Sequence, residues 1–180
     1  MPTYIAFLRA INLGAKRKFP KADIVTATEA AGGRDVVTHI NTGNVRLTSA
    51  RRTRAGVERD LEAAYLAQTG FEVPTIAFTP GELAAIAEHA REMDAERPDL
   101  ERHYVYLLKD EPDAARVASL EAKSAGADQV VVRGRAAHVL FGPGYQAGNV
   151  DPFQVERTLG AVATNRNRNV ICTLAEGWAS

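Results

Sequence analysis

The chain has very few sulfur-containing residues and no long apolar run. Cys172 is its one cysteine, so no disulfide can form within the chain, which fits a reducing compartment. The apolar run at residues 4–8 ends at Arg9, so it is too short for a signal peptide or for crossing a bilayer. We therefore expect a cytoplasmic protein with no membrane role.

The chain also lacks net charge, because its 22 basic and 22 acidic residues cancel. A nucleic-acid-binding domain usually has a basic excess, so the overall charge argues against that class and leaves only a local patch open. The length suits one domain or two small intertwined ones. A chain of this size removes roughly 70% of its unfolded-state surface from water, so it needs no disulfide or structural metal to fold.

Familiar catalytic and metal-binding patterns are missing as well. No metal-ligand spacing joins the four histidines, which are His39, His89, His103 and His138. There is no Gly-x-Ser-x-Gly elbow and no dinucleotide fingerprint. We interpret Cys172 as a core-facing helix residue and not as a nucleophile. The sequence predicts no metal site and no cofactor, and it leaves open whether the protein is an enzyme.

The first half of the chain predicts strands and helices in the order β-α-β-β-α-β, followed by one more helix. Residues 4–8 are typical of a strand covered on both faces. Residues 53–68 have apolar side chains at helical spacing, and Gly70 follows as a C-cap. Thr79 and Glu82 form a capping box at the start of the last helix. This order is the split βαβ, or ferredoxin-like, pattern.

The second half nearly repeats this order. It predicts a strand at residues 103–108, a helix at 112–123, a hairpin across Gly134 and a helix that Asp151 opens. We expect a final helix from about residue 167 in place of a fourth strand. A polar linker at residues 91–101 would join halves 1–92 and 101–180 within a single domain of residues 1–180. The predicted fold class is α+β, with two similar, intertwined ferredoxin-like subdomains of the βαββαβ type.

Two polar loops are the candidate functional segments. The first, at residues 9–18, places four cations, Asn12 and Gly14 between a strand end and a helix start, where sheet proteins often bind ligands. The alternative is a solvated basic loop. The second, at residues 164–169, has Arg166 and Arg168 before the last helix. A cation at a helix N-terminus costs roughly 0.3–1 kcal/mol. A bound anion would explain these arginines, and so would exposure to water or pairing with carboxylates.

The loops resemble motifs of a bacterial family known as domain of unknown function 1697 (DUF1697). Its Arg-Gly-Ile-Asn-Val-Gly-Gly-Lys-type loop corresponds to Arg9-Ala-Ile-Asn-Leu-Gly-Ala-Lys16. Its Thr-Tyr-Ile-Gln-Ser-Gly-Asn-Val motif corresponds to Thr38-His-Ile-Asn-Thr-Gly-Asn-Val45, and its Thr-x-Arg-Asn-Trp-x-Thr-Val motif to Thr164-Asn-Arg-Asn-Arg-Asn-Val-Ile171. The chain is identified as a divergent member over essentially its full length. The resemblance implies two interlocked α+β subdomains and carries no established function.

The chain departs from the family pattern at several places. The family's Ser-Lys pair is missing from residues 144–149, which are Gly-Tyr-Gln-Ala-Gly-Asn, and its Asn-Pro-Phe-type segment is missing at residues 88–93. His39 stands where the family has Tyr, and Arg168 where it has Trp. If these positions support catalysis in relatives, this member has lost it or has changed its ligand.

The leading hypothesis is a cleft between the two halves that binds a small anionic or phosphorylated ligand. The predicted ligand-binding residues supply charge or hydrogen bonds: Arg9, Asn12, Lys16, Asn44, Thr164, Arg166 and Asn167. One alternative is a nucleic-acid-binding module with exposed aromatic side chains on its strands. Another is a structural or interaction protein whose polar motifs hold the two halves together. The sequence leaves the oligomeric state open.

Overall fold

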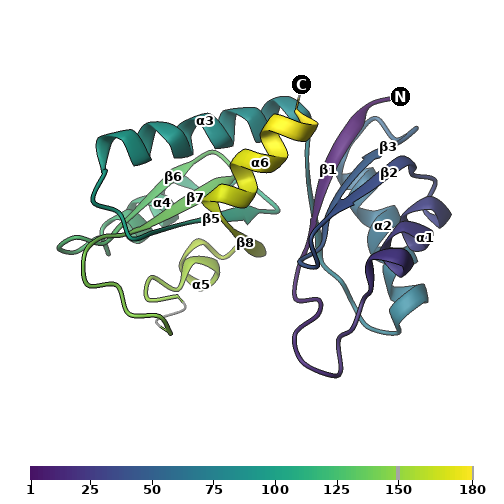
Figure 1. Cartoon of the computed structure of the whole chain (residues 1–180), viewed down its shortest axis with the longest axis horizontal. Coiled ribbons are helices and arrows are strands. Elements are labelled where there is room, and N and C mark those ends of the chain that lie inside the picture. Colours follow the sequence, from purple (N-terminus) through teal and green to yellow (C-terminus); the bar gives the residue numbers. More distant parts are fainter. Residues whose placement is uncertain (149–150, 180) are drawn as a thin grey trace. The chain divides into compact units, whose positions relative to one another are not determined.

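The computed structural model describes residues 1–148 and 151–179, so Asn149 of the divergent glycine-rich segment lies outside the described residues. The chain divides into two compact units (Figure 1). Unit 1 comprises Met1–Leu83 and the last residues from Glu176 onward, and unit 2 comprises Ala84–Ala175. Each unit contains one four-stranded antiparallel sheet.

The sheet of unit 1 has the strand order β2-β3-β1-β4. Its strands are β1 (Thr3–Leu8), β2 (Arg34–His39), β3 (Asn44–Thr48) and β4 (Thr75–Phe78). Helices α1 (Lys21–Ala30) and α2 (Arg54–Thr69) cover one face of it (Figure 1). Tyr65 of α2 is fully buried in this core, where its hydroxyl shares a 2.8 Å hydrogen bond with Thr28 of α1.

The sheet of unit 2 has the equivalent order β6-β7-β5-β8. Its strands are β5 (Arg102–Leu108), β6 (Gln129–Arg133), β7 (Ala136–Phe141) and β8 (Ala163–Asn167). Helices α4 (Ala114–Glu121) and α5 (Val155–Leu159) contribute Leu120 and Leu159 to the core on one face. Helices α3 (Pro80–Glu96) and α6 (Arg168–Trp178) lie on the opposite side from α5 (Figure 1). The predicted α+β fold with two similar ferredoxin-like halves is confirmed.

Several local predictions are confirmed by hydrogen bonds and backbone angles. The Thr53 hydroxyl caps α2 by accepting from the Gly56 N–H at 3.2 Å, and Gly70 ends the helix at φ +75°. The capping box at Thr79 and Glu82 is present, with both of its reciprocal bonds. Cys172 is buried on α6, as expected of a core-facing residue. No helix in residues 1–148 and 151–179 has the length and apolar character needed to cross a membrane.

The prediction that unit 2 lacks a fourth strand was wrong. Residues 163–167 form β8, which pairs antiparallel with β5 from Leu108 opposite Ala163 to Tyr104 opposite Asn167. The segment Ala-Thr-Asn-Arg-Asn shows no alternation of apolar and polar side chains, so its extended form depends on the hydrogen bonds to β5. The Glu156 carboxylate also accepts a 2.7 Å hydrogen bond from the Ala163 N–H at the start of this edge strand.

The predicted linker at residues 91–101 is helical for half of its length, because α3 continues to Glu96. Its polar side chains belong to good helix formers, and Arg91 pairs with Glu88 one turn earlier at 3.5 Å. The helix ends just before Pro98, since the residue before a proline disfavours helical geometry. The boundary between the units falls within α3, after Leu83. Similarly, α5 begins at Val155 and not beside Asp151, although the Asp151 carboxylate accepts from the Val155 N–H.

Candidate functional site

The seven residues predicted to bind a ligand divide between the two units. Unit 1 contains Arg9, Asn12, Lys16 and Asn44, and unit 2 contains Thr164, Arg166 and Asn167.

The two asparagines of unit 1 use their amide groups to hold the backbone of their own loops. The Asn12 Nδ2 donates to the Phe19 and Asn41 carbonyls at 3.1 and 2.8 Å, and its Oδ1 accepts from the Phe19 N–H at 2.8 Å. The buried Asn44 donates from Nδ2 to the His39 carbonyl and to the Thr42 hydroxyl, both at 3.0 Å. These contacts fix the first two motifs in place.

The cations of the first loop differ in what surrounds them. Arg17 is part of the loop's framework, because its Nε donates to the Ala10 carbonyl at 2.6 Å and its Nη2 to the Glu72 carbonyl at 2.8 Å. Its guanidinium also lies over the Phe71 ring, 4.5 Å from the centroid. Lys16 is exposed and Arg9 is half-buried.

Thr164 and Arg166 lie on one face of β8, two residues apart. The Arg166 Nη1 donates to the Thr164 hydroxyl at 2.9 Å and to the Asn165 carbonyl at 2.7 Å. Burial lowers the pKa of Arg166 to about 10, so the side chain keeps its charge at neutral pH. The structure therefore places a buried cation inside unit 2, on the strand next to β5, which contains His103.

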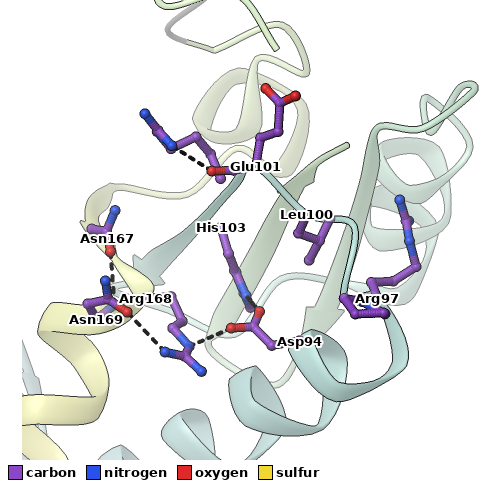
Figure 2. A pocket seen from close by; sticks show the side chains of 10 residues that line it. Asp94, Arg97, Leu100, Glu101, His103, Asn167, Arg168 and Asn169 are labelled. Carbon is purple, nitrogen blue, oxygen red and sulfur yellow. Dashed lines mark hydrogen bonds and ion pairs between the residues drawn. The ribbon is translucent and has the colours of Figure 1, made fainter. Parts of the chain in front are cut away.

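Asn167 lines a cavity of about 290 Å³ in unit 2 (Figure 2). The cavity lies where the end of α3, the start of β5 and the junction of β8 with α6 meet. Its lining is mostly polar and consists of Asp94, Arg97, Pro98, Leu100, Glu101, Arg102, His103, Asn167, Arg168 and Asn169.

Asp94 is the centre of a polar network in this cavity (Figure 2). Its Oδ1 lies 2.6 Å from Nδ1 of His103, and its Oδ2 lies 2.6 Å from Nε of Arg168. The second contact is an ion pair whose N–H is not aligned with the carboxylate. Arg168 also donates from Nη1 to the Asn169 side chain at 2.9 Å, and the Asn169 N–H donates to the Asn167 side chain at 2.9 Å. Asn167 thereby caps the start of α6.

Behind Asp94 lies a buried pair of histidines. The His103 Nε2 is 3.0 Å from the His138 Nδ1, and the His138 side chain has no exposed surface. Burial lowers the pKa of His103, against the opposing effect of Asp94, while Arg168 lowers it further. Burial, followed by the charges of His103, His89 and Arg133, lowers the pKa of His138 to about 3. Both rings are therefore neutral at pH 7.

The proton positions follow from this neutrality. We assign the His103 Nδ1–H to Asp94, which leaves Nε2 of His103 to accept from the Nδ1–H of His138. The His138 Nε2 then carries a lone pair without a hydrogen-bond partner among the described residues. Since His103 Nε2 is already engaged, His103 lacks a free nitrogen with which to act as a general base toward the cavity.

The two other arginines of the cavity differ in how firmly they are held. Arg97 forms a two-pronged contact with Asp99, at 2.9 Å for both bonds, and also donates to Gln129 at 2.9 Å. Arg102 is exposed, donates to the Glu101 carbonyl and lies over the Tyr145 ring, 5.8 Å from its centroid. Arg97 thus holds the turn after α3, whereas Arg102 is an exposed residue of the cavity wall.

Asp94, Arg102 and His103 were not predicted from the sequence as site residues. Asp94 lies in the segment interpreted as a linker, and no spacing pattern connects it to Arg168. Arg168 stands within the third family motif, and its pairing with a carboxylate was one of the alternatives left open; the partner is Asp94. Within residues 1–148 and 151–179 there is no group of three or more His, Cys, Asp or Glu side chains suited to a metal ion.

The fold and site define an α+β protein with two ferredoxin-like units and an arginine-containing polar cavity in the second. The family model described as protein of unknown function (DUF1697) matches residues 1–138, and the chain belongs to this family. The chain is similar in structure to the conserved bacterial protein SP0830 from Streptococcus pneumoniae, with a TM-score of 0.71, 18% sequence identity and 97% of each chain covered. That likeness concerns the fold. No curated protein matches the chain.

Proposed function

We propose that the protein binds a small anionic or phosphorylated ligand in the cavity of unit 2. The observation that supports this most is that Arg168, Arg102 and the N-terminus of α6 all border the same cavity. The first N–H groups of a helix lack acceptors within the helix, and its dipole places about half a positive charge there. Together with two guanidinium groups, this end of α6 favours an anion.

The charges of the cavity are arranged in pairs around Asp94. Of the three arginines in the lining, Arg97 is paired with Asp99, which leaves Arg102 and Arg168 beside the two carboxylates of Asp94 and Glu101. Asp94 reaches Arg168 from the α3 side, so a ligand approaching through the cavity would add a second anionic partner to the same guanidinium. Asn167 and Asn169 would orient the ligand through their amides.

The size and lining of the cavity favour a small and polar ligand. Its volume of about 290 Å³ is at the lower limit of ordinary ligand pockets. Leu100 and Pro98 are its apolar lining residues, and its lining contains no Phe, Tyr or Trp side chain. A phosphate group with a short polar remainder fits this description better than an apolar cofactor does.

For the motifs of unit 1 we propose a structural role. The Asn12 and Asn44 amides hold loop backbone within unit 1, which supports a structural role for them. For Lys16 and Arg9, which also belong to unit 1, ligand binding stays a prediction from the sequence.

A thermal-shift screen against sulfate, phosphate, sugar phosphates and nucleotides tests the proposal. A ligand at 100 times its dissociation constant stabilises the folded protein by about 2.7 kcal/mol. We expect stabilisation of the wild-type chain and of Arg157→Gln, a control that removes an exposed arginine of α5. Arg168→Gln should lose the ligand response relative to its own ligand-free melting temperature. No stabilisation by any anion, or an equal response in Arg168→Gln, would reject the proposal.

A further inference from the structure

Asp94 is shared between Arg168 and His103, which both line the cavity, and the Nε2 of His103 is engaged with His138 on the far side of the ring. Its two oxygens lie 2.6 Å from Arg168 Nε and 2.6 Å from His103 Nδ1. Anything that changes the charge on the Arg168 side therefore changes the environment of His103. We propose, on the basis of the proposed anion site, that ligand binding there is coupled to the uptake of one proton by the His103–His138 pair, so that binding tightens as pH falls.

The coupling follows from the charges around Asp94. In the free protein, burial keeps His103 neutral and the nearby Arg168 cation adds to this effect. An anion bound to Arg168 compensates that positive charge and brings a negative charge within reach of the same network. Both changes favour a protonated His103, which would then pair with the Asp94 carboxylate as a cation.

The histidine pair has a defined place for the additional proton. The lone pair of His138 Nε2 has no hydrogen-bond partner among the described residues. A proton bound there allows the Nδ1 proton of His138 to pass to Nε2 of His103, across their 3.0 Å contact. His103 then carries protons on both nitrogens and His138 on Nε2 alone. One proton from solvent is added per ligand, and no other bond is made or broken.

Other charged groups face the pair from the elements packed around it. His89 of α3 and Arg133 of β6 act on His138, and both disfavour its protonation. In the cavity, Arg97 is paired with Asp99, while Glu101 and Arg102 lie at its wall. Arg168 is therefore the cation whose compensation acts most directly on His103.

Isothermal titration calorimetry with sulfate measures the coupling on the full chain, because sulfate does not itself titrate between pH 5 and 8. The same titration in two buffers of different ionisation enthalpy gives the number of protons taken up. We expect uptake approaching one proton near pH 6 and little uptake at pH 8. Linkage then requires sulfate affinity to rise by up to about tenfold per pH unit as pH falls through this range.

Two histidine variants test whether the proton that is taken up binds to the His103–His138 pair. His103→Asn keeps an N–H donor near Asp94 Oδ1 and removes the titrating ring, so sulfate should still bind without proton uptake. His39→Asn, a control in unit 1, should retain the uptake. If His103→Asn does not fold, the wild-type calorimetry decides alone.

The possible failures are distinguishable. Sulfate binding with no proton uptake between pH 5 and 8 overturns the coupling and leaves the proposed anion site standing. Uptake that persists in a folded His103→Asn also overturns it, since the proton then goes elsewhere. Absence of binding by both sulfate and phosphate overturns the coupling and the proposed function together.

Discussion

The Asp94 carboxylate and the Arg168 guanidinium, 2.6 Å apart, connect the C-terminal half of α3 to the first residue of α6. An arginine at the start of a helix is unfavourable toward the helix dipole, and a carboxylate at this distance offsets that cost. Under the proposed function, the same carboxylate stabilises the free protein and would compete with a ligand anion for Arg168.

Asp94→Asn tests this double role. The amide oxygen can still accept from His103, but the charge that offsets Arg168 is lost. The ion pair is about 30% exposed, so we expect the free energy of unfolding to fall by only about 1–2 kcal/mol. Sulfate affinity should rise, because Arg168 loses its internal competitor. Urea denaturation and calorimetry measure the two effects. Glu88→Gln, which breaks an exposed pair on the same helix, should change the stability by less than about 0.5 kcal/mol and leave sulfate affinity unaltered.

Stability should decrease on acidification because His138 resists protonation in the folded state. Its folded pKa of about 3 lies far below the unfolded value near 6.5, so the two states bind protons equally above pH 6.5. Below that pH the unfolded state binds more protons, and stability falls by up to about 1.4 kcal/mol per pH unit until pH 3. Urea denaturation between pH 8 and 5 measures the slope.

His138→Asn provides the matched variant for this pH dependence. Its amide N–H can take the place of the Nδ1–H donor to His103, and it cannot titrate. The slope of the unfolding free energy against pH, below pH 6.5, should therefore be shallower by up to about 1.4 kcal/mol per pH unit, which corresponds to one proton. An unchanged slope would show that the acid sensitivity arises from other groups.

Gly43 should be intolerant of any side chain. At φ +78° it lies in the left-handed region, and an added Cβ would stand 2.7 Å from Leu8 Cβ and 2.8 Å from Ile11 Cδ1. Gly14 has a similar φ of +70°, but none of the described atoms lies within 4 Å of the position that a Cβ would take there. We expect Gly14→Ala to cost about 1–2 kcal/mol from backbone strain alone. Gly43→Ala should cost about 1–3 kcal/mol more because of the steric overlap. Equal losses in denaturant titrations would contradict the close packing at Gly43.

Asn12→Asp separates loop support from ligand binding in the first motif. The change removes the amide donor to the Phe19 and Asn41 carbonyls and places a negative charge beside them. The free energy of unfolding should fall by about 1–3 kcal/mol, while sulfate binding in unit 2 should be retained. Lys16→Gln, at an exposed position of the same loop, should leave the stability within about 0.5 kcal/mol. A stable Asn12→Asp variant would argue that the motif's asparagine is not structural.

Features predicted correctly from the sequence depend on residues close together in the chain. The start of α2 near Thr53, its end at Gly70 and the turn at Gly134 each follow from a few neighbouring side chains and from backbone angles that glycine tolerates. The order of these elements then led to the ferredoxin-like fold. The strand β8 could not be predicted in this way, because its extended form depends on pairing with β5.

In the candidate site, too, some features follow from neighbouring residues and others from long-range contacts. The sequence by itself determined the α+β architecture and the presence of an arginine-bearing motif before the last helix, since both depend on local patterning, and the resemblance of its motifs indicated the family. Tertiary structure alone decided that Arg168 meets Asp94, that Asp94 meets His103, and that Asn12 and Asn44 hold backbone. The reason is physical: an ion pair or buried hydrogen bond depends on distances set by packing, and no periodicity in the chain encodes which distant carboxylate reaches a given arginine.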